Sequence, residues 1–319
     1  MIKVGVIRGG VSPQYDSSLT TGGHILSALR HDDLSDKYKV VDMFLDKEGV
    51  LHMGGVAVHP SDIHNKVDIV FNALHGEFGS DGKLQQILDQ WRIPYTGSGI
   101  FPSALSHNQK LSKYKLQSIG LQTPQYIGLP AYSSHYDGDE GTYAKSKARE
   151  VWSKMPAPWT VRPIIQGSSM GIHVCKTFED LVRALERAAR NGISVIVEEL
   201  ILGKRASVAV VENFRNQNLY ALPSVEHRDA NYICPAKFPH NEKAELERLA
   251  KFVHNAFGLA HYSNINFAIH PKKGIYILDV ETTPSLDADS HTHYSLQTVG
   301  SSLGEFVDHI VQLALQRGR

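Results

Sequence analysis

Two short segments, more than a hundred residues apart, most constrain what this chain can fold into and bind. Trp159–Val174 reads WTVRPIIQGSSMGIHV, a predicted strand that ends in a cation, then a loop of small residues and a second strand. Asp279–Pro284 reads DVETTP and places two carboxylates two residues apart on a predicted strand. A fixed cation and an accessible loop backbone suit polyphosphate, and two carboxylates on one strand face suit a divalent metal. Together the segments predict a metal–nucleotide site.

The composition excludes several other classes of function. The chain has 319 residues, enough for two or three domains, and its 42% hydrophobic and 21% charged content is typical of a soluble globular protein. The formal net charge is zero, so nothing favours nucleic acid or an anionic membrane, and no apolar run approaches the roughly 18 residues of a membrane span. Cys175 and Cys234 lack metal-ligand spacing, and we expect reduced thiols in a cytoplasmic protein.

The first hundred residues alternate between predicted strands and helices, which indicates a parallel sheet with helical crossovers. Strands are expected at Ile2–Ile7, Lys39–Leu45 and Val67–Ala73, and this unit is expected to end near Phe101. Later elements include a helix at Ser103–Gly120, a helix from Thr177 to Arg190 that starts with a capping box, and a hairpin of Asn264–Ile269 with Gly274–Val280.

The loop QGSSMG has the composition of a phosphate-binding flap. It lacks the lysine of a P-loop, but its glycines let the backbone approach phosphates, and Gly167, Ser168 and Ser169 supply small donors. Arg162 just before the loop provides a strand-anchored cation for phosphate oxygens. The alternative interpretation is an ordinary serine–glycine turn, and the loop by itself does not decide between the two.

Three further positions carry candidate chemistry, each with a plainer alternative. Asp279 and Glu281 share one strand face next to apolar neighbours, which favours a ligand over a solvated face. Glu198 and Glu199 end an apolar strand, where a carboxylate could take an adenine amino group, although an exposed strand end fits equally well. His75 begins the loop HGEFGSDG at a strand end and would contact a substrate carboxylate, or else cap the next helix.

Six ordered motifs resemble those of the D-alanine–D-alanine ligases of the ATP-grasp superfamily, over nearly the whole chain. The matching segments are GGVSPQ at 9–14, HGEFGSDGKLQ at 75–85, YTGS at 95–98, SALSHNQK at 103–110, VRPIIQGSSMG at 161–171 and LDVETTPSLDADS at 278–290. The resemblance implies an α/β ATP-grasp fold with an N-terminal parallel-sheet domain (1–101), a small central α+β domain with the flap (102–200) and a C-terminal α+β domain with the metal site (201–319).

The resemblance also implies a two-step reaction. ATP phosphorylates the carboxylate of one D-alanine, the amine of a second attacks the acylphosphate, and the dipeptide enters peptidoglycan precursor synthesis. The cofactors would be ATP and Mg²⁺ or Mn²⁺, and the protein would be a homodimer acting on small amino acids. Matched by motif, the ATP-binding residues would be Lys110, Arg162, Gly167, Ser168, Ser169, Glu198, Glu199 and Ile201. The metal ligands would be Asp279, Glu281 and Asn266, and the substrate-binding residues His75, Ser290 and Asn264.

Several positions depart from the family pattern. Among the residues matched to catalytic positions, Ser168 and Ser285 keep a hydroxyl and a backbone N–H, but Gln14 stands where the family has a glutamate that orients the substrate amine. Arg205 falls at the ribose-binding glutamate, a reversal of sign. The family segment RVDF reads NINF, so its arginine and metal-binding aspartate become Asn264 and Asn266.

The substrate loop with its Lys-Tyr pair, expected between Val225 and Pro235, is also shortened. Two hypotheses therefore follow. The first is an ATP-grasp ligase of the D-alanine–D-alanine type, or a close relative that joins other small carboxylate and amine substrates. The second is a degenerate member that binds nucleotide or amino acid without turnover. An unrelated dinucleotide-binding enzyme is disfavoured because the glycine pair Gly9–Gly10 lacks the GxGxxG spacing.

Overall fold

The computed structural model describes residues 1–167, 170–228 and 231–317. The chain divides into two compact units. Unit 1 comprises Met1–His107, Lys204–Phe267 and Asp279–Arg319, and unit 2 comprises Asn108–Gly203 and Ala268–Leu278. Two of the predicted flap residues, Ser168 and Ser169, lie outside the described residues. The three-domain division stays a prediction. No helix in the described part of the chain is long and apolar enough to cross a membrane.

The N-terminal sheet of unit 1 has five strands in the order β4-β3-β2-β1-β5. Its strands are β1 (Ile2–Gly9), β2 (Tyr38–Leu45), β3 (Leu51–Met53), β4 (Val56–Ala57) and β5 (Ile69–Asn72). β1 pairs in parallel with β2 and β5, which confirms the predicted crossovers, and β3 and β4 form an antiparallel edge. The helical elements are α1 (Tyr15–Leu29), α2 (Asp32–Ser35), η1 (Pro60–Asn65), α3 (Lys83–Gln90) and α4 (Ile100–His107).

The second sheet has the order β13-β12-β10-β14-β15, with β11 paired beside β10. Its strands are β10 (Lys204–Glu212), β11 (Leu219–Ala221), β12 (Val225–Arg228), β13 (Asn231–Ile233), β14 (Tyr262–His270) and β15 (Gly274–Glu281), with helices η2 (Phe214–Asn216), α8 (His240–Phe257), α9 (His291–Thr298) and α10 (Leu303–Gln316). The predicted β14–β15 pairing is confirmed. In unit 1, one apolar core joins α1, α10 and strands of both sheets, with Ile25, Phe306 and Val211 among its buried members.

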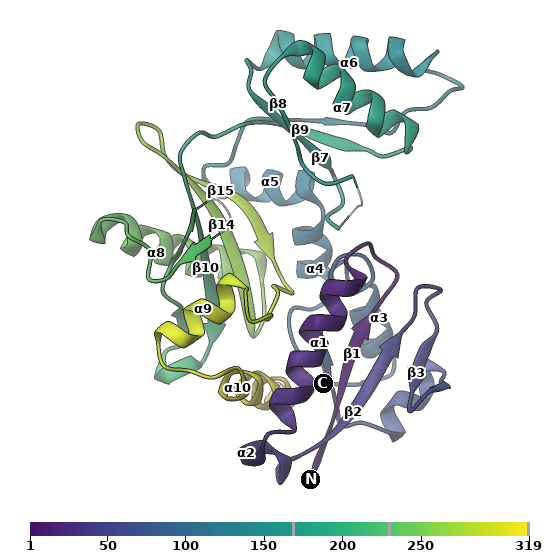
Figure 1. Cartoon of the computed structure of the whole chain (residues 1–319), viewed down its shortest axis with the longest axis vertical. Helices are drawn as coiled ribbons and strands as arrows, with labels where there is room; N and C mark the ends of the chain where they lie inside the picture. Colours follow the sequence, from purple (N-terminus) through teal and green to yellow (C-terminus); the bar gives the residue numbers. More distant parts are fainter. Residues whose placement is uncertain (168–169, 229–230, 318–319) are drawn as a thin grey trace. The chain divides into compact units, whose positions relative to one another are not determined.

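Unit 2 contains a four-stranded sheet in the order β6-β9-β7-β8. Its elements are α5 (Gln109–Ser118), β6 (Tyr126–Leu129), α6 (Glu140–Lys154), β7 (Trp159–Pro163), β8 (His173–Cys175), α7 (Phe178–Arg190) and β9 (Val195–Glu199). Helices α6 and α7 lie on the same face of this sheet (Figure 1), and their apolar sides bury Trp159 and Leu181. The capping box predicted at Thr177 and Asp180 starts α7.

The single helix predicted at Ser103–Gly120 is wrong, because the chain forms α4 and α5 with a break at Asn108. Asn108 has an extended backbone, and its side-chain oxygen accepts the Leu111 N–H at 3.0 Å. An asparagine N-cap satisfies an otherwise unpaired donor of a new helix, which favours the restart over a continuous helix. The break also places Lys110 and Lys113 near the start of α5.

Candidate functional site

The most deeply buried charges of unit 2 form a cluster of two cations on one carboxylate. Lys113 Nζ lies 2.8 Å from Glu198 Oε1, and Arg162 Nε lies 2.9 Å from Glu198 Oε2. The side chains of Lys113 and Glu198 are 1% and 6% exposed. Both cations also donate to the carbonyl oxygen of Leu278, at 3.1 Å from Lys113 and 3.3 Å from Arg162. Leu278 directly precedes Asp279 in the chain.

The sheet register explains how this cluster assembles. β7 and β9 are antiparallel, with Thr160 opposite Glu198 and Arg162 opposite Ile196. Arg162 is therefore a diagonal neighbour of Glu198 on one face, within reach of a long side chain. Glu198 is buried, so the alternative of an exposed strand end is wrong.

Lys113 completes the cluster from α5 and was missed by the sequence interpretation. It lies in the buried stripe of that helix with Gln109, Ser112 and Leu116. A lysine within such a stripe is the signal that could have identified it, because a fully buried lysine requires a partner.

The other predicted nucleotide residues of unit 2 are placed less tightly. Lys110 is exposed, and its side chain runs past Gly128, where an added Cβ would lie 3.0 Å from the lysine Cδ. Glu199 pairs with Lys273 at 3.1 Å. Ile201 is buried, and Gly167 has a φ of 78°, a conformation that favours glycine. These residues belong to one unit, but the Glu198 carboxylate is already paired with two cations.

The predicted metal residues of unit 1 form a second, differently charged cluster. The Asn264 side-chain amide donates to Glu281 Oε2 at 3.0 Å, and the Asn266 amide donates to Glu281 Oε1 at 2.8 Å. Burial, and then the negative charge of Asp279, raise the pKa of Glu281 to about 7, against the amide hydrogen bonds that lower it. The structure thus brings together the residues predicted to bind metal, Asp279, Glu281 and Asn266, and adds Asn264, which was predicted to bind substrate.

This donor set fits a hard divalent cation. Among the described residues no group of three or more His, Cys, Asp or Glu side chains could hold a metal, but Mg²⁺ needs only one or two protein carboxylates. Asp279 raises the pKa of Glu281 because the two like charges repel each other, and a bound cation would relieve this repulsion. Asn266 contributes an amide oxygen, which now accepts hydrogen bonds from Ser207 at 2.5 Å and Asn264 at 3.0 Å.

A chain of polar contacts leads away from this cluster to the hairpin β12–β13. Ser207 Oγ lies 2.7 Å from His227 Nε2, and the His227 ring stacks on His291 with centroids 6.1 Å apart. Tyr232 of β13 packs edge-on against both rings. This hairpin occupies the segment where the Lys-Tyr loop was expected. The sequence interpretation missed Ser207 and His227, because only the sheet order places β10, with Ser207, between β14 and β12, with His227.

Burial lowers the pKa of both histidines in this chain of contacts. The pKa of His227 falls below its usual value through burial and the charge of Arg205. The pKa of His291 falls to about 4 through burial and the neighbouring His227. Both imidazoles are therefore neutral at pH 7, and the region around Glu281 contains neutral donors where a cationic side chain was expected from the family pattern.

The predicted substrate residue His75 lies in a third cluster, also in unit 1. Its Nδ1 lies 3.1 Å from the carbonyl oxygen of Thr283 and its Nε2 lies 3.0 Å from Thr21 Oγ1. Burial lowers the pKa of His75, while the Thr283 carbonyl and the charge of Asp287 raise it. Ser80 Oγ lies 2.7 Å from Thr283 Oγ1, which links the two loops. The plainer expectation that His75 caps the next helix is wrong, since Gly82 occupies that position.

The remaining predicted residues border this cluster. Gln14 is the exposed N-cap residue of α1. Its Oε1 lies close to Gly76, since a Cβ added to that glycine would be 2.8 Å from it. Ser285 Oγ accepts the Asp287 N–H at 3.2 Å. Ser290 is buried and accepts the His293 N–H as the N-cap of α9. Ser290 thus has a structural hydrogen bond in addition to its predicted contact with substrate.

Comparisons with known proteins agree with these observations. Residues 116–312 match the model for the D-ala D-ala ligase C-terminus, and residues 53–98 match that for the D-ala D-ala ligase N-terminus. The D-alanine–D-alanine ligase of Fervidobacterium nodosum is 28% identical over 98% of this chain and 99% of its own length.

Solved structures show the same fold. The Bacillus anthracis D-alanine–D-alanine ligase complexed with ATP has a TM-score of 0.79 at 22% identity, covering 99% of this chain and 98% of the other. The VanG D-Ala:D-Ser ligase of Enterococcus faecalis has a TM-score of 0.80 at 21% identity, covering 98% and 99%. These likenesses confirm the predicted ATP-grasp fold. Because one family model covers more than half of its length, the chain belongs to the D-alanine–D-alanine ligase family, as a divergent member.

Proposed function

We propose that the protein is an ATP-dependent carboxylate–amine ligase that joins small amino acids of the D-alanine type. The observation that carries the proposal is the pair Asp279 and Glu281 on β15, where the negative charge of Asp279 helps to raise the pKa of Glu281 to about 7. Buried like charges are costly without a ligand and are common at functional sites. A divalent metal that accompanies ATP would compensate them.

The residues divide the work by chemistry. Lys110 and Arg162 would hold ATP phosphates, the flap with Gly167, Ser168 and Ser169 would cover them, and Glu199 and Ile201 would border the adenine. Asp279, Glu281 and Asn266 would hold Mg²⁺ or Mn²⁺, which would neutralise charge on the transferring phosphoryl group. Lys113 would hold Glu198 in position and so fix Arg162 in its place, since all three share one buried cluster.

The amino-acid side would be formed by unit 1. His75, Gln14 and Ser290 would border the carboxylate-bearing substrate, and the Ser285 backbone N–H would stabilise the oxyanion. Asn264 stands at the position of the arginine in the family pattern, and the rings of His227 and His291 nearby are neutral. The loss of that cation supports a change in the second substrate. A solved structure of the same fold is a D-Ala:D-Ser ligase, so D-serine belongs in any substrate panel beside D-alanine. We also expect a cytoplasmic homodimer in peptidoglycan precursor synthesis.

A second candidate function is nucleotide or amino-acid binding without turnover. It is favoured by one observation, that both carboxylate oxygens of Glu281 accept hydrogen bonds from asparagine amides. Metal binding at Glu281 would have to displace or reorient these amides.

The experiment that tests the proposal is phosphate release from Mg-ATP with D- and L-amino acids and small hydroxy acids, with mass detection of products. Release that depends on D-alanine, with a dipeptide as the product, is the expected result. No release with any pair, while ATP still raises the melting temperature, would overturn the ligase and favour the second candidate. A protein with Glu281→Ala serves as the control, since it should release no phosphate under any condition.

A further inference from the structure

The loop between β15 and α9 carries a carboxylate that the sequence interpretation did not use. Asp287 Oδ1 accepts a hydrogen bond from Thr21 Oγ1 at 2.6 Å, and Thr21, on α1, is 1% exposed. The Asp287 side chain is 24% exposed, so the carboxylate is partly open to solvent while the hydroxyl that holds it is buried. A hydroxyl anchored in the core thus fixes one oxygen of this carboxylate in place.

The second oxygen of Asp287 is open. Within the part of the chain that the structure describes, Asp287 Oδ2 accepts no hydrogen bond, and the ion-pair partner of the carboxylate is His24, whose Nδ1 lies 3.8 Å from Oδ1. A distance of 3.8 Å is too long for a hydrogen bond. The carboxylate is therefore oriented by its Thr21 contact while keeping acceptor capacity for a ligand.

The hydroxyl that anchors Asp287 also contacts a residue of the proposed amino-acid site. Thr21 Oγ1 also contacts His75 Nε2, so Asp287 and His75 are joined through one hydroxyl. Burial lowers the pKa of His75, while the Thr283 carbonyl and the charge of Asp287 raise it. Gln14, which begins the same helix face seven residues before Thr21, offers an uncharged amide.

We infer that Asp287 binds the protonated amine of an amino-acid substrate and so selects α-amino acids over the corresponding hydroxy acids. The inference rests on the proposed function, because it names the ligand of that same site. A fixed, half-buried carboxylate with an open oxygen matches an ammonium group, and a charge-assisted hydrogen bond of this kind is stronger than a neutral one. A hydroxyl in place of the amine gains little from the negative charge.

The test compares D-alanine with D-lactate, which differs by having a hydroxyl for the amine. Ligand-observed NMR titrations without ATP would give the dissociation constants for the wild-type protein, Asp287→Asn and Asp289→Asn. Asparagine has the shape of aspartate and still accepts the Thr21 hydrogen bond, so only the charge changes. We expect Asp287→Asn to weaken D-alanine binding by roughly 10- to 100-fold and to change D-lactate binding less than about twofold.

Asp289→Asn is the matched control, because Asp289 is exposed and two residues farther along the same loop. It should leave both dissociation constants unchanged. Equal effects of Asp287→Asn on D-alanine and D-lactate, or no effect on either, would overturn the inference.

If Asp287→Asn does not fold, Thr21→Val frees the carboxylate from its anchor. That variant should weaken D-alanine binding severalfold and Thr21→Ser should restore it, whereas unchanged binding in Thr21→Val would count against the assignment.

The binding readout separates this inference from the proposed function. Phosphate release from Mg-ATP with D-alanine, combined with unaltered D-alanine binding in Asp287→Asn, would leave the ligase standing and remove Asp287 from its site. Selective loss of D-alanine binding in Asp287→Asn, without phosphate release in the wild-type protein, would support Asp287 and remove the ligase.

Discussion

Two glutamates that end strands of the same sheet have pKa values shifted in opposite directions. Glu212 is the last residue of β10, Glu281 is the last residue of β15, and β14 lies between these strands. Both have an ordinary pKa of 4.5, yet that of Glu212 falls to about 2 and that of Glu281 rises to about 7. The same residue type at equivalent strand ends thus differs only through its neighbours.

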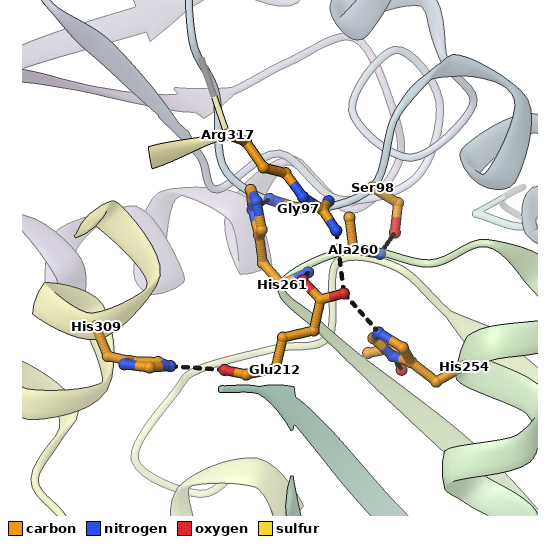
Figure 2. A network of polar contacts seen from close by, with 9 residues as sticks. Gly97, Ser98, Glu212, His254, Ala260, His261, His309 and Arg317 are labelled. Atoms are coloured by element: carbon orange, nitrogen blue, oxygen red, sulfur yellow. Dashed lines mark hydrogen bonds and ion pairs between the residues drawn. The ribbon is translucent and has the colours of Figure 1, made fainter. Parts of the chain in front are cut away.

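Glu212 is surrounded by groups that favour its charged form (Figure 2). Burial by itself would raise its pKa, but His254, the His261 N–H at 2.7 Å and Arg317 at 3.1 Å together lower it. The network continues into the YTGS motif, since the Gly97 N–H donates to His261 Nδ1 at 2.9 Å. Ser98 Oγ accepts the Ala260 N–H at 3.1 Å. This part of the molecule supplies its own positive charge, from Arg317, as a structural ion pair does.

Glu281 has neutral partners and an acidic neighbour. The amides of Asn264 and Asn266 satisfy its oxygens without supplying charge, and Asp279 adds repulsion. Glu198 in unit 2, like Glu212, has counter-charges within the chain, because Lys113 and Arg162 both pair with it. The comparison teaches that a carboxylate whose counter-charge is missing from the folded chain is a candidate for an external cation, whereas one whose counter-charges are present stabilises the fold.

The largest expected effect is on the stability of unit 2. Glu198→Gln leaves two cations, one of them fully buried, without their counter-charge, so we expect the free energy of unfolding to drop by about 3–5 kcal/mol. Urea denaturation followed by tryptophan fluorescence in a Trp91→Phe background measures this unit, which holds the other two tryptophans, Trp152 and Trp159. Glu199→Gln removes only the more exposed contact with Lys273 and should cost less than about 1 kcal/mol. Similar losses in the two variants would show that the cluster is not a structural ion pair.

Glu281→Gln should have the opposite consequence for stability and a large one for activity. Removing a buried charge that repels Asp279 should leave the metal-free protein at least as stable as the wild type at pH 8. Turnover of Mg-ATP should fall by about 100-fold or more, a loss of roughly 2.7 kcal/mol in transition-state stabilisation. Melting curves and phosphate release, measured in parallel on Glu281→Gln and the wild type, test the two expectations. A clear loss of stability without metal would mean that the charge of Glu281 supports the fold.

Glu212→Gln should lower stability in a pH-dependent way. Because the folded pKa of Glu212 is depressed from 4.5 to about 2, its stabilising contribution is fully present above pH 4.5 and is lost as the pH falls toward 2. We expect a cost of about 1–2 kcal/mol at pH 7, reduced for partial solvent screening, that shrinks below pH 4. Glu245→Gln, which breaks the exposed contact with Arg248, is the control and should cost no more than about 0.5 kcal/mol. A difference between Glu212→Gln and wild type that persists unchanged at pH 2.5 would refute the assignment.

The smallest expected effect comes from Asn266→Asp, which adds a third carboxylate beside Glu281. In EDTA the melting temperature should fall by about 2–4 °C, as about 1 kcal/mol does in a chain of this size. Added Mg²⁺ should more than restore it, because a cation now gains another charged ligand. A melting temperature that ignores Mg²⁺ in both the variant and the wild type would argue against a metal at this position.

Sequence reasoning succeeded where local pattern decides structure. The capping box at Thr177, the β14–β15 hairpin and the parallel strands of the first sheet follow from hydrogen bonding and periodicity within short segments. The helix break at Asn108 was missed, although asparagine is a good N-cap, because the surrounding sequence also suits a continuous helix. Glu198 was assigned to adenine, since its two buried cations come from other elements.

By itself, the sequence determined the family, the ATP-grasp fold and the identity of most candidate site residues, because motif order and strand periodicity are properties of the linear chain. The tertiary structure decided the charge state and the partners of those residues. Glu281 differs from Glu212, and Asp287 gains its anchor on Thr21, only through contacts between segments up to 266 positions apart. Burial and neighbouring charges set a pKa, and both depend on which distant segments the fold brings together.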